Sequence, residues 1–365
     1  MRYAPTMNTG PMRLKTSLAL LIVVLISACG ANPRNAGAAD NVQKIVIAHR
    51  GASGYLPEHT LAAKAVAHAQ GADYIEQDLV MTRDDRVIVL HDHHLDQVTN
   101  VRDIFPDRHR EDGRFYVIDF TLEEIRSLSV FERFETVNEV STPVFEDRFP
   151  FAKSHFEVHT FEEEIELVQG MNKSMGRSVG IYPEIKSPAF HTHEGKDLSQ
   201  AVLDILKTYG YVEKSDRVYL QCFDWAEIRR IHNELMPQMG MDLRLVQLLE
   251  LSEEFKQLRE DGAFVNLAKV ADGIGPSIHM IVEPDSPATE LRITKLVTLA
   301  HAAGMEVHPY TFRRDAGSIP DYADGFEDLL DIFLYEVGVD GIFTDFPDLA
   351  ARYIESRQGL ESQAQ

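Results

Sequence analysis

Short apolar segments alternate with helical patterns along the chain from Lys44 onward. Nine of these segments are four to seven residues long and rich in Val, Ile, Leu and Tyr, which is typical of buried strands. The predicted strands are Ile45–His49, Tyr74–Leu79, Val87–His91, Gly180–Ile185, Val218–Cys222, Leu243–Leu248, Ile274–Met280, Val307–Phe312 and Gly341–Thr344. Their alternation with helices predicts an α/β fold with a largely parallel sheet.

Several helices have recognisable ends. Thr60 precedes a helical pattern over Leu61–Gln70, and the segment from Asp224 to Glu227 resembles a capping box. Two further helical patterns, Leu291–Ala303 and Leu329–Val337, each stop before a glycine, the residue that most often ends a helix. These ends place helices between the predicted strands.

One pair of predicted strands cannot be parallel. Only residues 80–86 separate Tyr74–Leu79 from Val87–His91, whereas a parallel crossover needs about a dozen residues or more. This pair therefore predicts an antiparallel hairpin with Asp84 and Asp85 near its tip. The other eight strands predict a TIM (β/α)8 barrel, and an open doubly wound sheet is the alternative.

The stretch from His94 to Val179 is too long to be a single loop. It contains helix starts of its own at Thr121-Leu-Glu-Glu and Thr160-Phe-Glu-Glu. We therefore expect an insertion, residues 94–179, that forms a small subdomain over the barrel mouth. The barrel domain is expected to span residues 44–356, followed by a polar tail over 357–365.

The composition limits the possible partners. The chain has 365 residues, 36 Lys and Arg against 58 Asp and Glu, and a formal charge of −22. This acidity argues against binding to nucleic acid or to an anionic lipid surface, because both need a basic protein surface. An anionic small substrate would need positive charge supplied within its own site. The two cysteines, Cys29 and Cys222, are too few for a disulfide framework or a Cys-based zinc site.

Residues 1–28 have the features of an export signal. Arg13 and Lys15 precede the apolar run 17–26, which is too short to span a bilayer comfortably. The run leads into Ile26-Ser-Ala-Cys29-Gly, which resembles the bacterial lipobox, whose Cys is lipidated and becomes the first mature residue. An ordinary secretory signal with an incidental Cys29 is the alternative. Residues 29–43 then predict a flexible tether, and we expect a periplasmic protein anchored to a bacterial membrane by lipid.

Three acidic residues are expected to meet at the C-terminal mouth of the barrel. Glu76 and Asp78 are two residues apart and so share one face of a strand, and Glu184 comes from another predicted strand. Carboxylates inside an apolar barrel repel one another unless a cation joins them. A set of oxygen ligands favours a hard cation, Ca²⁺ or Mg²⁺. A Glu-x-Asp pair on its own is more typical of a surface hairpin with solvated acids.

Basic and titratable side chains are expected at the same mouth. His49 and His91 end strands on either side of the acidic pair, and imidazoles suit acid–base work near neutral pH. Arg50 offers a planar fork for a phosphate and Lys186 a point charge. Each histidine taken singly is more often structural, but the whole set is suited to splitting a phosphate ester. The chain has no Walker-type glycine loop and no Gly-x-Ser-x-Gly elbow.

The segment His49-Arg-Gly-Ala-Ser-Gly-Tyr-Leu-Pro-Glu-His-Thr60, followed by Glu76-x-Asp78 and His91-Asp92, closely resembles the glycerophosphodiester phosphodiesterase family. Four later segments extend the resemblance: Pro183-Glu-Ile-Lys186, Leu220-Gln-Cys-Phe-Asp224, Gly273-Ile-Gly-Pro276 and Thr344-Asp-Phe-Pro347. The resemblance covers the chain from about Lys44 to about Ser356 and is greatest to the periplasmic branch, including surface lipoproteins. Ser277 departs from the acidic residue expected at its position.

This resemblance implies a TIM barrel that hydrolyses deacylated phospholipids, such as glycerophosphocholine and glycerophosphoethanolamine, to glycerol 3-phosphate and a free alcohol. It implies that Phe223 and Tyr310 line the glycerol or head-group side, and we expect a monomer or a homodimer. The other implied roles are metal binding, usually of calcium, by Glu76, Asp78 and Glu184, acid–base catalysis by His49 and His91, and phosphate binding by Arg50 and Lys186.

Two other functions fit parts of the pattern. Barrel phospholipases of the D or C type use related histidine and carboxylate sets on intact lipids, but they need an apolar rim that faces the membrane. The insertion instead carries a charged run from Arg108 to Arg114, which favours soluble head groups. A non-enzymatic surface lipoprotein that binds a ligand or a host partner is the third possibility. The presence of His49, Glu76 and His91 argues against it.

Overall fold

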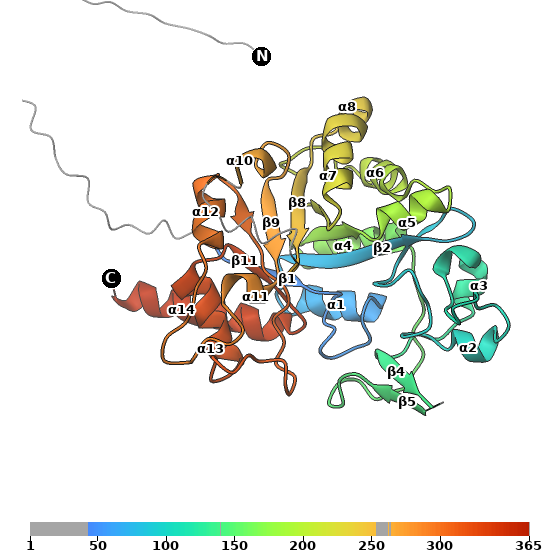
Figure 1. The fold of residues 1–365 in the computed structure, drawn as a ribbon, viewed down its shortest axis with the longest axis horizontal. Helices are drawn as coiled ribbons and strands as arrows, with labels where there is room; N and C mark the ends of the chain where they lie inside the picture. The colour runs from blue at the N-terminus through green and yellow to red at the C-terminus, as the bar shows by residue number, and fades with distance from the viewer. Residues whose placement is uncertain (1–42, 139, 253–261, 263, 365) are drawn as a thin grey trace, which may run out of the picture. The chain divides into compact units, whose positions relative to one another are not determined.

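Eight parallel strands form one sheet in the computed structural model, which describes residues 43–138, 140–252, 262 and 264–364. Their order around the sheet is β10-β9-β8-β7-β6-β2-β1-β11. Figure 1 shows β1, β8, β9 and β11 in the middle of the barrel domain, with β2 running out toward the hairpin. The strands are β1 (Ile45–Ala48), β2 (Tyr74–Met81), β6 (Gly180–Ile185), β7 (Tyr219–Cys222), β8 (Arg244–Leu249), β9 (Gly273–Pro276), β10 (Glu306–Val307) and β11 (Gly341–Thr344). Each overlaps one of the eight strands predicted for the barrel, although β10 shares only Val307 with the predicted Val307–Phe312.

The two ends of this sheet meet. Strand β10 is short, but the extended chain after it runs beside β11. The amide of Phe312 donates to the carbonyl of Phe343 (2.8 Å), and the amide of Phe343 donates to the carbonyl of Pro309 (3.0 Å). Phe312 and Thr344 also form a parallel bridge. The sheet is therefore a nearly closed barrel, which confirms the TIM-barrel prediction and excludes the open doubly wound sheet.

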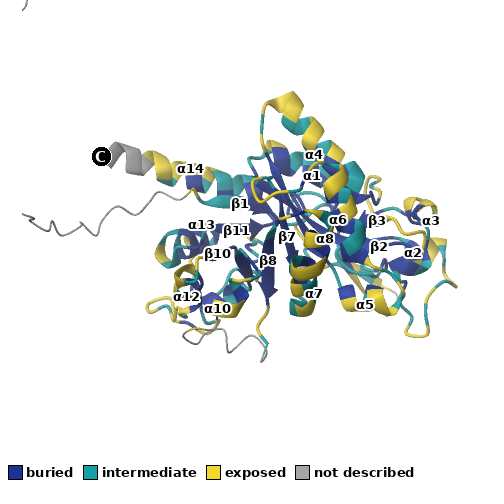
Figure 2. Ribbon diagram, turned by 90° about the horizontal axis from the view of Figure 1, so that it is seen from above, coloured by how far each residue is buried: buried dark blue, intermediate teal, exposed yellow. Residues whose placement is uncertain are grey.

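Helices surround the strands (Figure 2), with their buried faces against the sheet and their exposed faces outward. This layering buries apolar side chains of both, which is the main stabilising contribution to the fold. The principal helices are α1 (Leu61–Ala69), α4 (Phe161–Met175), α5 (Pro188–His193), α6 (Leu198–Thr208), α7 (Trp225–Arg230), α8 (Met236–Met239), α10 (Phe264–Leu267), α12 (Leu296–Ala302), α13 (Phe326–Asp331) and α14 (Pro347–Ala364). Helix α14 continues through most of the stretch 357–365 that the sequence predicts as a polar tail. Two π-helical segments, Ile231–Leu235 and Ile332–Val337, continue α7 and α13.

Strand register decides which side chains share the barrel interior. Strands β2 and β6 pair so that Asp78 lies opposite Glu184, and Glu184 lies opposite Gln221 of β7. Since side chains alternate along a strand, Tyr74 points to the same face as Glu76 and Asp78, and Tyr182 to the same face as Glu184. Tyr74 and Tyr182 belong to one buried cluster with Tyr219 of β7. A packed aromatic layer therefore fills the barrel on the N-terminal side of the carboxylates, since each tyrosine precedes the polar residue of its strand by two positions.

The predicted hairpin is present. Strand β3 (Val87–Val89) runs antiparallel to the end of β2, with Leu79 opposite Val89 and Met81 opposite Val87. Asp85 has a φ of 60°, a value that Asp tolerates in tight turns. The hairpin extends β2 beyond the barrel and returns the chain to its mouth at His91.

Residues 94–160, called the inserted segment below, form a structure of their own beside the barrel. It contains α2 (Val101–Ile104), a 3₁₀ turn (Val117–Asp119), α3 (Leu122–Arg126) and the two-stranded sheet of β4 (Phe134–Val137) and β5 (Val140–Pro143). Both expected helix starts, at Thr121 and Thr160, are capping boxes. The inserted segment has its own apolar cluster, which includes Phe115, Phe120 and Ile125 and joins Ile88 of the hairpin. Helix α4, which follows Thr160, packs on the barrel in the same cluster as α1, so the separate structure is shorter than the expected insertion 94–179.

A buried carboxyl in the inserted segment gives a stability prediction. Glu132 is 3% exposed, and its Oε2 has no hydrogen-bond partner. Burial, assisted by Glu58, Asp345 and Asp315, raises its pKa from the ordinary 4.5 to about 8. Between these two pH values Glu132 is ionised in the unfolded chain but protonated in the folded protein. The stability of the folded protein therefore falls as the pH rises. Glu132→Gln is therefore expected to stabilise the protein by up to about 3 kcal/mol at pH 7 and by little at pH 4.5.

Urea unfolding of Glu132→Gln at the two pH values measures this difference. Glu135→Gln, a change at an exposed position nearby, is the matched control and should alter stability little at either pH. An equal stabilisation by Glu132→Gln at both pH values would contradict the assignment, because the effect would then not come from ionisation.

Two further predicted elements differ from the structure. The strand predicted over Ile274–Met280 is wrong in its second half, because β9 ends at Pro276. Ser277 there caps the short helix α11 (Ile278–Ile281), its hydroxyl accepting from the amide of His279. The helix predicted from Leu291 begins only at Leu296, because Ile293 forms an antiparallel bridge with Val282. In both cases an apolar run does not distinguish strand from helix, and contacts outside the run decide.

The predicted signal (1–28), Cys29 and all but the last residue of the predicted tether (29–43) lie outside the described residues. Within the described part of the chain, every helix falls short of the length or the apolarity that crossing a bilayer requires.

Candidate active site

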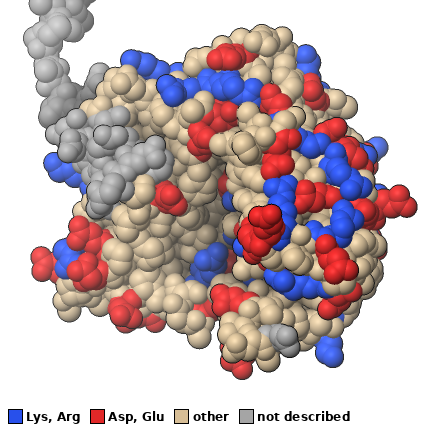
Figure 3. Space-filling view, turned by 45° about the vertical axis from the view of Figure 1, so that its right-hand side comes forward, with Lys and Arg blue, Asp and Glu red and all other residues tan. Residues whose placement is uncertain are grey.

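A cavity of about 450 Å³ lies at the C-terminal ends of the barrel strands. Figure 3 shows a hollow in this part of the molecule, with basic side chains at its edge and acidic and basic side chains interleaved on the surface beside it. The structure brings together in this cavity all nine side chains to which the sequence assigned catalytic, metal-binding or substrate-binding roles. They are His49, Arg50, Glu76, Asp78, His91, Glu184, Lys186, Phe223 and Tyr310. Ser277 lines the same cavity.

The three carboxyl groups predicted to bind metal are almost fully buried. Glu76, Asp78 and Glu184 are 2%, 1% and 6% exposed. Burial and the neighbouring Asp78 raise the pKa of Glu76 well above its usual range, and burial raises the pKa of Glu184 to about 8. Burial also opposes ionisation of Asp78, but Lys186, His91 and His59 together hold its pKa well below the usual range. The neighbouring cations therefore do not suffice to keep all three carboxyls ionised, and a divalent cation fits the group.

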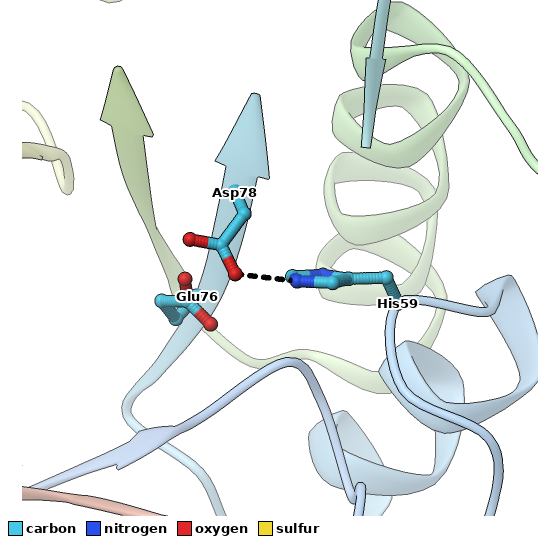
Figure 4. A group of neighbouring side chains, drawn as sticks. All are labelled: His59, Glu76 and Asp78. Carbon is cyan, nitrogen blue, oxygen red and sulfur yellow. Dashed lines mark hydrogen bonds and ion pairs between the residues drawn. The ribbon is translucent and has the colours of Figure 1, made fainter. Parts of the chain in front are cut away.

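His59 lies beside these acids, although the sequence analysis gave it no role. Its Nε2–H donates to Asp78 (2.7 Å), and its Nδ1 is buried without a hydrogen-bond partner. Figure 4 shows His59 pointing from the loop before α1 toward Asp78 and Glu76 on β2. Possible ligand atoms of these three residues lie within 4.8 Å of one another, while Glu184 pairs with Lys186 at 2.9 Å. The sequence pointed to His59 only through its position in the motif that runs from His49 to Thr60.

His49 is held in one orientation by a buried carboxylate. Its Nδ1–H donates to Oδ1 of Asp345 at 2.6 Å. Burial, followed by the charge of Arg50, lowers its pKa to about 4 despite the opposing effect of Asp345. The imidazole is therefore neutral near pH 7. Because Nδ1 carries the proton, the lone pair of Nε2 is available to act as a base.

His91 has the same arrangement on the other side of the acids. Its Nδ1–H donates to Oδ1 of Asp92 at 2.8 Å, so that its Nε2 is also available for proton transfer. Its side chain is 30% exposed. Burial and the charges of Arg50 and Lys186 lower its pKa. The pairing of each histidine with an aspartate was not predicted.

The backbone after β1 aims Arg50 into the cavity. Arg50 has a φ of 57° and Gly51 a φ of 86°. A Cβ atom at Gly51 would lie 2.8 Å from the carbonyl carbon of Ala63, so only glycine fits there. The amide of Arg50 donates to Glu76 (2.6 Å), and its guanidinium pairs with Glu58 (3.0 Å). Its Nε makes no hydrogen bond and lies 3.6 Å from Oδ2 of Asp78, within ion-pair distance.

One wall of the cavity is aromatic. The rings of Phe223 and Tyr310 meet edge to face with centroids 5.9 Å apart, and Lys186 Nζ lies 5.9 Å from the centre of the Phe223 ring. Arg313 also lines the cavity and donates to Asp345 (2.8 Å), a position that the sequence analysis missed. The cavity thus combines an aromatic wall with cations that suit an anion.

Sequence comparisons identify relatives along nearly the whole chain. The family described as "Glycerophosphoryl diester phosphodiesterase family" matches residues 49–349. A glycerophosphodiester phosphodiesterase from Haemophilus influenzae is 47% identical over 363 residues, which cover 94% of this chain and 99% of the relative. One from Treponema pallidum is 39% identical, over 86% of this chain and 92% of the relative.

Solved structures share the fold. One from Silicibacter pomeroyi has a TM-score of 0.64 and 25% identity, over 87% of this chain and 95% of the other. A phosphodiesterase from Oleispira antarctica, solved in complex with its product sn-glycerol-3-phosphate, has a TM-score of 0.55 and 19% identity, over 86% of this chain and 97% of the other. The family match and the two close relatives confirm the resemblance drawn from the motifs: this chain belongs to the glycerophosphoryl diester phosphodiesterase family.

Proposed function

We propose that this protein hydrolyses glycerophosphodiesters, such as glycerophosphocholine and glycerophosphoethanolamine, to sn-glycerol 3-phosphate and an alcohol. The observation that supports this most directly is the cavity itself. It places three buried carboxyls beside two histidines, each backed by an aspartate, and beside the cations Arg50 and Lys186. The choice of glycerophosphodiesters as the substrate class is supported by the membership of the chain in the family.

The cation required is divalent, and we propose Ca²⁺, with Mg²⁺ as the competitor. Glu76, Asp78 and Glu184 would hold it through oxygen atoms, and His59 would keep Asp78 in place. When bound, such a cation neutralises charge on a phosphate oxygen and makes the phosphorus a better electrophile. Crowded carboxyls in a buried site suit this role, because the cation removes their mutual repulsion.

The protein's own groups bind the phosphate and move protons. Arg50 and Lys186 would hold the phosphate oxygens as charge grows on them. Unprotonated Nε2 of His49 would accept the proton of the attacking hydroxyl. His91 would give a proton to the leaving alcohol from its protonated form, in which Nε2 carries a hydrogen and Nδ1–H still donates to Asp92. The attacking oxygen is either the substrate's neighbouring glycerol hydroxyl, which gives a cyclic phosphate that water then opens, or water itself. Trapping of a cyclic glycerophosphate with purified protein separates the two routes.

Release of glycerol 3-phosphate from glycerophosphocholine tests this function. We expect release by the purified protein, its loss after treatment with a chelator, and its return on addition of Ca²⁺. No release by folded, calcium-loaded protein would contradict the proposal. Faster reaction on intact phospholipid vesicles than on glycerophosphocholine would show instead that the protein is a phospholipase.

We also propose that the protein is exported to the periplasm and anchored through lipid on Cys29. The support is the run 17–26 followed by Ile26-Ser-Ala-Cys29, together with the polar residues up to Asn41. Recovery of the protein with membranes, and its release to the soluble fraction by Cys29→Ala, would bear this out. The proposal would be contradicted if the wild type and Cys29→Ala divided equally between the membrane and soluble fractions.

A further inference from the structure

Two arginines of the inserted segment reach the mouth of the barrel. Arg148 donates to Asp345 (2.6 Å), to Asp315 (2.8 Å) and to the carbonyl of Ser53 (3.1 Å). It is the more enclosed of the two, with 4% of its side chain exposed. Arg133 donates to Asp92 (2.8 Å) and to Glu58 (2.6 Å).

Both arginines bind the carboxylates that hold the histidines. Asp345 accepts from His49 through Oδ1 and from Arg148 through Oδ2. Asp92 accepts from His91 through Oδ1 and from Arg133 through Oδ2. The same chain of groups, imidazole to carboxylate to guanidinium, is therefore built twice, and in both cases the guanidinium comes from the inserted segment.

This arrangement has a mechanical consequence. A carboxylate bound only by an imidazole is free to rotate about its side-chain torsions, and the imidazole then loses its fixed tautomer and direction. A charge-assisted bond to the second oxygen removes that freedom. Asp345 is further held by Arg313, but only Arg148 of the two also binds Asp315 and so links the two carboxylates.

The arrangement also has an electrostatic consequence. Asp92 and Asp345 lie beside a cavity in which negative charge is proposed to grow on the phosphate oxygens during the reaction, and unpaired carboxylates there would oppose that growth. The positive charge of each arginine offsets one of these negative charges while leaving Oδ1 available to the histidine. Arg133 additionally balances Glu58, the partner of Arg50.

We propose that the inserted segment is a working part of the active site, in which Arg148 and Arg133 are positioning residues that act on His49 and His91 through Asp345 and Asp92. This inference rests on the phosphodiesterase function proposed above. It predicts an effect on the chemical step rather than on substrate binding, because neither arginine lines the cavity.

Steady-state kinetics of Arg148→Met with glycerophosphocholine test the proposal. Substitution of residues that orient active-site ligands from behind commonly costs about 10- to 100-fold. We therefore expect kcat to fall by about that factor while KM stays within about threefold. Arg148→Lys should recover part of the loss, because an ammonium reaches Asp345 but cannot span Asp345 and Asp315 together. Arg133→Met should lower kcat in the same way.

Arg110→Met is the matched control. Arg110 belongs to the same inserted segment and also bridges two carboxylates, Asp119 and Glu194, but it lies away from both histidines. Its kcat should equal that of the wild type. If folded Arg148→Met and Arg133→Met keep kcat within threefold, or if Arg110→Met falls as far as they do, the inference is wrong. If Arg148→Met does not fold, Arg148→Lys and Arg133→Met decide by the same criteria. An inactive wild type would count against the proposed function instead.

Discussion

Replacement of His49 by Asn is expected to lower kcat by about 10³-fold, within the range of 10² to 10⁴ that a positioned acid or base contributes. Asn retains a donor that can reach Asp345, so the local hydrogen bond survives while the basic Nε2 is lost. His91→Asn should cause a loss of similar size, because its Nε2 has the complementary task. The measurement is the initial rate of glycerol 3-phosphate release at saturating substrate and calcium.

The double variant His49→Asn/His91→Asn tests whether the two histidines act in the same reaction. Since both groups act in one reaction, the two losses should be far from additive, and the double variant should be little slower than either single one. His193→Asn is the control, because His193 is exposed and lies outside the cavity. A loss of less than tenfold in both single variants, with normal circular dichroism, would remove His49 and His91 from the reaction.

Glu76→Gln is expected to abolish metal-dependent activity and to change the response of stability to calcium. Glu76 is buried beside Asp78 and Glu184, so its ionisation without a cation is unfavourable and its pKa is raised. In the unfolded chain the carboxyl of Glu76 ionises at a lower pH than in the folded protein. The metal-free protein therefore loses stability as the pH rises above about 4.5. The neutral amide removes this cost, and metal-free Glu76→Gln should melt at a higher temperature than the metal-free wild type at pH 8.

Addition of calcium should reverse that order. A ligand that binds only the folded state at about 100 times its Kd stabilises it by about 2.7 kcal/mol, so the wild type should gain and Glu76→Gln should not. Melting curves in chelator and in calcium measure both effects. Glu135→Gln, at an exposed position, should respond to calcium as the wild type does. An unchanged calcium response in Glu76→Gln would show that this carboxyl is not a ligand.

Local pattern accounts for the parts of the site that were predicted. His49, Glu76, Asp78, Glu184 and Lys186 stand on or just after apolar segments that the sequence marks as strands. In a parallel barrel all strand ends of one kind meet at the same mouth, whichever strands are neighbours. The residues could therefore be assigned to one cavity without knowledge of a single contact between them. The hairpin was predictable from another local property, because the connection 80–86 is too short for a parallel crossover.

Contacts distant in the sequence account for what was missed. His49 and Asp345 are 296 positions apart, and Arg148 and Asp345 are 197 apart. An aspartate after a strand has the same local appearance whether it binds a metal, a histidine or water. Ser277 likewise ends β9 by capping α11, which an apolar run over Ile274–Met280 does not reveal.

The sequence by itself determined the alternation of strands and helices, the barrel, the cavity to which nine side chains belong and the family. Periodicity, capping and strand-end position are local properties, and they need only neighbouring residues to be expressed. The tertiary structure alone decided that His59 joins the acids and that Asp345 holds His49. It also showed that the inserted segment supplies the arginines behind the two histidines. These pairings depend on the register and closure of the barrel, which bring together side chains that no local pattern connects.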